Sequence, residues 1–256
     1  MHIIEQEEPS KEFQAAWMSA GKHLESQCNG GINWIRTSLR QPFIEHLSFR
    51  IGNQLFFVFV EAAEFHLSER YDALMAFADL ANAVPCVIRM NKNIALYEPS
   101  ETGWGLLHAA TKERIDPLAL VSDELIEMSD WEVHDFAISV VENKLEEEGK
   151  KVYSTCSDIN LTPSLWFVEN NIHYWVVVRG QRHPSPSGER PDNIDQIAEG
   201  IPGYESNGYF AEVTVASSED PFDPDAMKNG NFLPLYRGHP MTIKYSGIQP
   251  LDTRGV

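Results

Sequence analysis

The stretch at residues 47–60 reads LSFRIGNQLFFVFV, and it decides how the chain folds. His46–Ile51 and Gln54–Glu61 have the β-branched and aromatic composition of strands, and Gly52-Asn53 between them is typical of a tight turn. Leu55–Val60 is apolar at consecutive positions, which indicates that both faces of this arm are covered. The stretch therefore predicts a β-hairpin whose second arm is a central strand.

A second stretch, LWFVENNIHYWVVV at residues 165–178, repeats the pattern of the first. Both begin with Leu, carry Asn at the seventh position and end in an apolar run, and the two copies are 118 residues apart throughout. Each is preceded by an amphipathic helix and followed by a helix and a strand, which favours an internal duplication. The alternative is that two unrelated hairpins share a common apolar pattern.

Apolar periodicity and turn residues predict the elements around the hairpins. The predicted helices are Ser10–Gln27, one capped by Ser68 and ended by Pro85, one from Ser129 to Gly149, and Asn193–Glu199. The predicted strands are Cys86–Met90, Ile94–Tyr97, Lys151–Cys156, Ser164–Val168, Ile172–Arg179, Tyr209–Ala216 and Met241–Tyr245. Ser129 and Glu132 have the spacing of a capping box. Glu98–Ser129 is expected to be a connector on the surface of the first unit.

These elements predict an α+β fold of two similar αβββαβ-type units. Their sheets should be mixed but mainly antiparallel, with flanking helices. We place an N-terminal α/β unit at residues 1–125 and a C-terminal α/β unit at residues 126–256.

The charge balance restricts the partners that the chain can bind. It contains 38 acidic and 20 basic residues, a net charge of −18, so it has no general field that would attract nucleic acid. Another protein, with a basic surface, fits this balance better. The sequence leaves open whether the chain also forms a homo-oligomer.

Other features of the composition indicate a cytoplasmic protein. No segment approaches the roughly 20 apolar residues of a membrane helix, and the glutamate-rich start, Met1–Lys11, is unlike a signal peptide. Cys28, Cys86 and Cys156 lie far apart, which argues against disulfides and against a CxxC metal site. We therefore expect no cofactor and no metal.

The second unit resembles the restriction-endonuclease-like PD-(D/E)XK nucleases. The resemblance covers roughly residues 129–217, in the order helix, three strands, helix, strand, with Pro163-Ser164 leading into the strand that ends at Arg179. It implies an acid after the proline, and an acid and a lysine one residue apart on the third strand. In that family the two acids hold Mg²⁺ and the lysine orients the attacking water.

This chain departs from the nuclease motif at each of those positions. Ser164 and Val177 stand where the acids are expected, and Arg179 replaces the lysine. An arginine keeps the positive charge but does not take part in proton transfer. The corresponding residues of the first unit, His46 and Glu61, do not restore the motif. The resemblance therefore implies the nuclease fold without its activity.

A second, weaker resemblance has the same order of elements. Small acidic chaperones of type III secretion are similar in running helix, three strands, helix, strands. This resemblance implies a cytoplasmic protein that binds other proteins and is not an enzyme. No motif in the sequence separates the two resemblances.

We find no catalytic residues, and the binding residues proposed are basic side chains near two turns. The candidate set is Arg179, Arg182, His183, Arg237 and His239. Arg182-His183-Pro184 and Arg237-Gly238-His239-Pro240 could bind an anion if the two loops meet. His134-Asp135 on a helix could suggest an acid/base or metal pair, but adjacent helix residues point about 100° apart, so the two would not converge on one ligand. We expect His134 to be a surface residue.

The sequence favours a non-enzymatic protein, a protein-binding or regulatory adaptor on a degenerate nuclease-like scaffold. One alternative is a metal-dependent phosphodiesterase with a relocated site that uses Glu142, Glu146 or Asp158. The other alternative is a module that senses an anion or a nucleotide through Arg179, Arg182 and Arg237.

Overall fold

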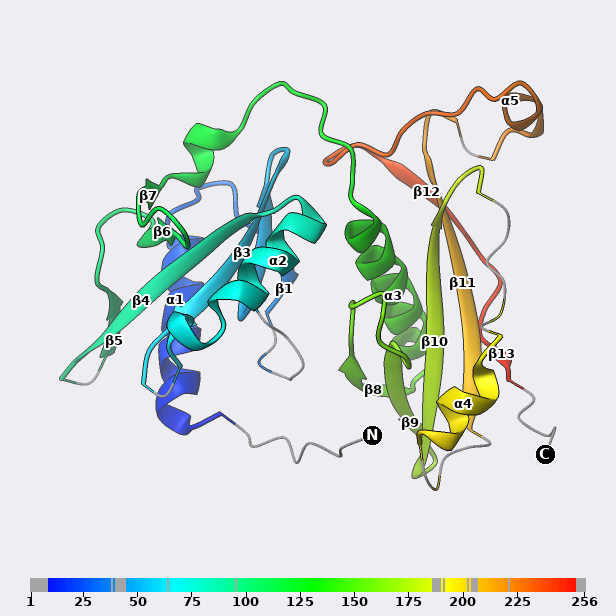
Figure 1. Ribbon diagram of the computed structural model, residues 1–256, viewed down its shortest axis with the longest axis horizontal. Coiled ribbons are helices and arrows are strands. Elements are labelled where there is room, and N and C mark those ends of the chain that lie inside the picture. Colours follow the sequence, from blue (N-terminus) through cyan, green and yellow to red (C-terminus); the bar gives the residue numbers. More distant parts are fainter. Residues whose placement is uncertain are drawn as a thin grey trace. The chain divides into compact units, whose positions relative to one another are not determined.

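The chain divides into two compact units, His2–Ile126 and Glu127–Val256, each described here by itself (Figure 1). The structure, a computed structural model, describes residues 9–37, 39, 45–63, 65–94, 96–185, 190, 192–201, 203, 207–220 and 222–251. The glutamate-rich segment before residue 9, and parts of the loops at 180–191 and 219–225, lie outside the described residues.

The first unit is a mixed sheet with a helix on each face. Its elements are α1 (Lys11–Ser26), β1 (Asn33–Arg36), β2 (Leu47–Ile51), β3 (Gln54–Glu61), η1 (Leu67–Glu69), α2 (Tyr71–Ala81), β4 (Val84–Asn93), β5 (Leu96–Pro99), β6 (Leu106–His108), β7 (Arg114–Ile115) and η2 (Pro117–Leu120). The strands lie in the order β1-β2-β3-β4-β6-β7, and β5 pairs with β4. Among the strands that the structure describes in this unit, only β3 and β4 pair in parallel, because α2 crosses over between them.

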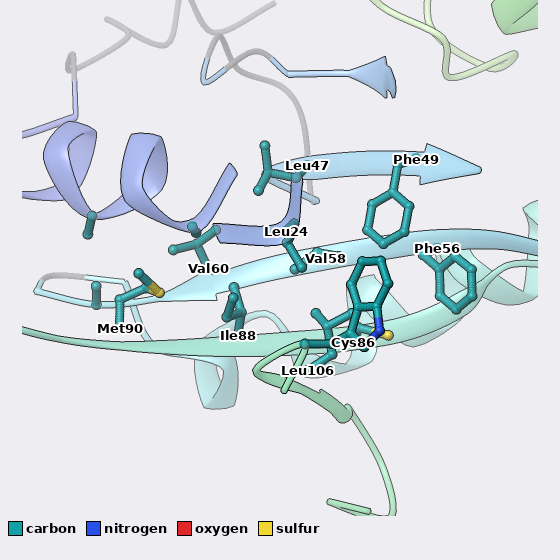
Figure 2. Close-up of a cluster of buried hydrophobic side chains, with 14 of the residues drawn as sticks. Leu24, Leu47, Phe49, Phe56, Val58, Val60, Cys86, Ile88, Met90 and Leu106 are labelled. Carbon is teal, nitrogen blue, oxygen red and sulfur yellow. The ribbon is translucent and has the colours of Figure 1, made fainter. Parts of the chain in front are cut away.

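The apolar face of α1 forms the larger core of this unit. Phe13, Ala16, Ala20 and Leu24 recur at helical spacing and are fully buried against the sheet. Figure 2 shows Leu24 beside Leu47, Val58 and Val60 in this cluster. Side chains on the other face of β3 pack against α2, where the rings of Phe57 and Phe77 stack with centroids 5.0 Å apart. The consecutive apolar run therefore serves two cores.

The second unit repeats this arrangement with different side chains. Its elements are α3 (Asp130–Glu147), β8 (Lys151–Thr155), β9 (Leu165–Glu169), β10 (Ile172–Arg182), α4 (Ile194–Glu199), β11 (Gly208–Ser217), α5 (Pro224–Lys228), β12 (Met241–Tyr245) and β13 (Gln249–Pro250). The strand order is β12-β11-β10-β9-β8, with β13 also on β11. The predicted capping box at Ser129 and Glu132 is present. Val176 and Val178 face the α3 core, whereas Trp175 and Val177 face α4.

The two sheets agree residue by residue in their pairing. Trp34 pairs with Phe49 in the first unit, and Val152 pairs with Phe167 in the second. Each residue of the second pair lies 118 positions after its counterpart in the first pair. The irregular step that follows Trp34 in β1 recurs after Val152 in β8. In both units the hairpin strands are antiparallel and the next strand is parallel. The predicted fold class is confirmed: α+β, with two similar units of mixed, mainly antiparallel sheets and flanking helices.

Three local predictions about the first unit were wrong. The supposed connector Glu98–Ser129 contains β6 and β7, which extend the sheet, and its Leu106 is buried. Pro85 lies inside β4, opposite Phe57. Ser68 lies in the 3₁₀ turn η1, and α2 begins later, after Arg70, without a side-chain cap.

Candidate functional site

The residues that replace the nuclease acids are parts of the second unit's interior. The Ser164 N–H donates to the carbonyl of Val176 at 2.9 Å, and the Ser164 Oγ accepts from the N–H of Val178 at 3.3 Å. Val177 is fully buried in an apolar cluster with Ile197 and Phe210. A hydroxyl engaged with the backbone and an aliphatic side chain do not fit a Mg²⁺ ion, which prefers carboxylate oxygens.

His46 performs the same structural role in the first unit. The backbone N–H of His46 donates to the carbonyl of Val58 at 3.0 Å, and the ring Nδ1 accepts from the backbone N–H of Val60 at 2.9 Å. These are the hydrogen bonds of Ser164, displaced by 118 residues. The ring packs against Phe13 and Phe59 with centroids 5.0 and 4.4 Å away. Burial, reinforced by the charge of Arg70, lowers the pKa of His46 to about 3.

We expect His46 to make the first unit sensitive to acid. The unfolded chain binds a proton at its ordinary pKa of 6.5, whereas the folded chain resists protonation down to about 3. The free energy of unfolding should therefore have its full value above pH 6.5 and fall as the pH drops toward 3. The expected loss is about 1.4 kcal/mol for each unit by which the folded and unfolded pKa values of His46 differ.

Urea titrations at several pH values would measure this dependence. His46→Asn keeps an acceptor for the Val60 N–H but cannot titrate, so its stability should vary less with pH than that of the parent. His66→Asn is the control, because His66 is exposed. Equal pH slopes for the parent and His46→Asn would contradict the assignment.

Arg179 occupies a position that carries a charge of the opposite sign in the first unit. Arg179 is the register partner of Glu212 on the parallel neighbour β11. At the matching position of the first unit, Glu61 is the partner of Arg89, and the Glu61 Oε2 to Arg89 Nε distance is 2.7 Å. Both pairs therefore join opposite charges, but the positive residue is on the hairpin strand in the second unit and on the parallel neighbour in the first. Partial burial lowers the pKa of Arg179.

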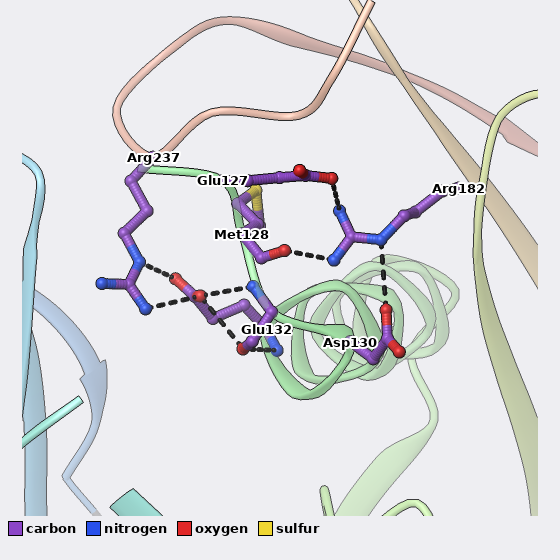
Figure 3. A network of polar contacts seen from close by, with 7 residues as sticks. Glu127, Met128, Asp130, Glu132, Arg182 and Arg237 are labelled. Carbon is purple, nitrogen blue, oxygen red and sulfur yellow. Dashed lines mark hydrogen bonds and ion pairs between the residues drawn. The ribbon is translucent and has the colours of Figure 1, made fainter. Parts of the chain in front are cut away.

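The other two predicted arginines each contact residues at the start of α3 (Figure 3). Arg237 is buried and forms two hydrogen bonds of 2.8 Å, from its Nε and one terminal nitrogen, to the carboxylate of Glu132. Arg182 donates to the Asp130 carboxylate at 3.1 Å and to the carbonyl of Met128. Its other terminal nitrogen lies 3.6 Å from the Glu127 carboxylate. The two predicted loops therefore contact the same segment, residues 127–132, and each arginine contacts carboxylates of the chain itself.

The five predicted binding residues do not converge on one site. Arg179 and Arg182 are three residues apart in β10, so their side chains leave opposite faces of the sheet. His183 packs edge-on against Phe222, with ring centroids 5.2 Å apart. His239 is exposed and contacts the ring of Tyr236. Arg182 and Arg237 contact the same segment at the start of α3, but through different carboxylates.

Our prediction that His134 lies on the helix surface, beside Asp135, was wrong. Both are buried, at 2% and 8% relative exposure, and Asp135 accepts a hydrogen bond from the Ser157 hydroxyl. Burial, with a contribution from the charge of Arg179, lowers the pKa of His134 to about 4. The helix buries more than one face near its N-terminus, which periodicity along a single apolar stripe does not predict.

Of the acids of the alternative phosphodiesterase site, Glu142 and Glu146 lie one turn apart on α3, where Glu142 is half-buried, and Asp158 lies in the loop after β8. Glu146 is exposed on α3, and the Asp158 carboxylate accepts from the backbone and side chain of Asn160. Among the described residues, no three His, Cys, Asp or Glu side chains are grouped as metal ligands. The described helices also include none that is long and apolar enough to cross a membrane.

Comparison with known proteins gives a match to the second unit. A family described as "Domain of unknown function (DUF8840)" matches residues 131–251, from the first turn of α3 to the residue after β13. The second unit is thus similar to that domain over nearly its whole described length. No curated protein and no solved structure matches the chain.

Proposed function

We propose that the chain is a non-catalytic protein-binding module, an adaptor or regulator, on a scaffold that resembles the nucleases without their chemistry. The observation that carries this proposal is the hydrogen bond that Ser164 accepts from Val178 and that His46 accepts from Val60. A side chain that satisfies a buried backbone N–H holds the strand in place and is not available to a metal or a water nucleophile. In both units a structural group stands where the resemblance implies a metal ligand.

We propose further that the partner is a protein with a basic surface and that the two meet in the cytoplasm. The excess of 38 acids over 20 bases supports a cationic partner and disfavours the phosphate backbone of nucleic acids. The engagement of Arg182 and Arg237 with Asp130 and Glu132 supports the same choice, because these arginines contribute little positive field to an approaching anion.

Affinity capture with the full chain, followed by titration of the purified partner, tests this proposal. We expect saturable binding that weakens when NaCl is raised from about 0.05 to about 0.5 M, because salt screens attraction between exposed charges. Failure to retain any protein above a tag-only control, together with turnover in the assay below, would overturn the proposal.

A hydrolysis assay separates binding from catalysis. The full chain should not cleave single-stranded DNA, duplex DNA or RNA in the presence of Mg²⁺ or Mn²⁺. Metal-dependent cleavage that disappears in Glu142→Ala would instead establish the relocated phosphodiesterase site. Glu147→Ala is the matched control, since Glu147 lies on the same helix and already pairs with Lys144 at 2.6 Å.

A further inference from the structure

The second unit has a sheet edge that the first unit covers with a strand of its own. In the first unit β6 pairs antiparallel with β4, and β7 then pairs with the outer side of β6. In the second unit β12 pairs antiparallel with β11 in the same way. Within the part of the chain that the structure describes, no strand pairs with the outer side of β12 (Figure 1).

The register shows which backbone groups of β12 face outward. The N–H of Ser218 donates to the carbonyl of Pro240, which directs residues 240, 242 and 244 toward β11. Because alternate residues of a strand direct their N–H and C=O groups to opposite sides, Met241, Ile243 and Tyr245 direct theirs to the free edge. In agreement with this register, Val215, which lies opposite Ile243 in β11, directs its carbonyl away from β12, where it accepts from the backbone N–H of His183.

The side chains of β12 make this edge complementary to itself. Met241 and Tyr245 pack toward the α3 core, Ile243 on the same face is 38% exposed, and Thr242 and Lys244 point to the other face. An antiparallel copy centred on Ile243 would place Met241 opposite Tyr245 and Lys244 opposite Thr242. Apolar groups would then meet apolar groups, and no like charges would lie directly opposite each other.

We propose that β12 pairs with β12 of a second copy of this chain, in an antiparallel arrangement with Ile243 on the two-fold axis. The pairing continues the sheet across both copies and satisfies the outward backbone groups of residues 241, 243 and 245. The second copy takes the place that β7 takes in the first unit. The edges formed by β1 and β8 suit this role less, because each carries an irregular step in its pairing.

Sedimentation of the full chain across a concentration series tests the pairing. The parent protein should reach twice the monomer mass, and the dimer should tighten as salt screens the net charge of −18 on each copy. Ile243→Pro removes an outward N–H without breaking a hydrogen bond to β11, and it should weaken the dimer by about tenfold or more while the far-UV spectrum is kept. Ile243→Val keeps that N–H and should still dimerise.

Charge variants at the same position test the two-fold axis itself, and they remain informative if the proline variant does not fold. Ile243→Lys and Ile243→Glu should each be monomeric, because like charges would face each other, and a mixture of the two should recover the dimer. A parent protein that stays monomeric at every concentration would overturn the proposal. So would a dimer that Ile243→Lys leaves unchanged, since its interface would lie elsewhere.

Discussion

Replacing Val177 by glutamate is expected to unfold the second unit, although it restores the acid that the nuclease family carries at this position. Val177 is fully buried beside Trp175, Ile197 and Phe210, with apolar neighbours on the α4 side of the sheet. An isolated carboxylate in such a place either remains charged at a high cost in solvation or takes up a proton. We expect a loss of more than about 4 kcal/mol, a large part of the 5–15 kcal/mol that stabilises a typical domain.

Circular dichroism in a urea titration would measure this loss. Ile172→Glu is the matched control, because Ile172 lies in the same strand and is 46% exposed, so its substitution should change stability by less than about 0.5 kcal/mol. If Val177→Glu were as stable as the control, the position would be open to solvent and the nuclease-like site could be rebuilt.

Removing Arg237 is expected to have the second largest effect. Its guanidinium and the Glu132 carboxylate are joined by two bonds of 2.8 Å, with side-chain exposures of only 1% and 5%. Arg237→Met would leave the Glu132 charge buried, with the N–H and hydroxyl of Ser129 still donating to its carboxylate. Breaking a buried pair in this way costs about 3–5 kcal/mol.

The neighbouring arginine provides the control for this prediction. Arg182 binds at the same helix end, but the side chain of its partner Asp130 is 83% exposed. Arg182→Met should therefore cost about 1–2 kcal/mol, from an exposed ion pair and the bond to the Met128 carbonyl. In the double variant Glu132→Leu/Arg237→Met the buried charge is gone, so it should be more stable than Arg237→Met alone. Equal losses in the two single arginine variants would contradict the assigned difference in burial.

Most of the fold could be predicted from the sequence because its signals are local. The hairpin at residues 47–60 combines strand composition with a two-residue turn. The similar stretch at 165–178 predicts the corresponding hairpin of the second unit. The capping box at Ser129 likewise depends on residues three positions apart. The strands β6 and β7 could not be predicted, because they are only three and two residues long and their stability comes from the neighbouring strands.

The candidate site was less predictable because its contacts join distant residues. Glu132 and Arg237 are 105 positions apart, so no spacing rule connects the capping box to the loop before β12. The sequence showed that Ser164 and Val177 stand where the nuclease family has acids, but it did not show which structural roles these two residues have. That a serine and a histidine accept the same backbone hydrogen bond in two copies becomes visible only in the folded chain.

The reversed charge pairs also bear on how two similar sheets in one chain avoid exchanging strands. If β3 paired with β11 in the native register, Glu61 would lie opposite Glu212, and β10 on β4 would bring Arg179 opposite Arg89. Each such like-charge contact disfavours the wrong pairing by up to about 1 kcal/mol, whereas both native pairings match opposite charges. Misassembly between similar units is a common hazard of repeated chains during folding. The reversed order of the charges therefore favours pairing of each parallel strand with the neighbour from its own unit.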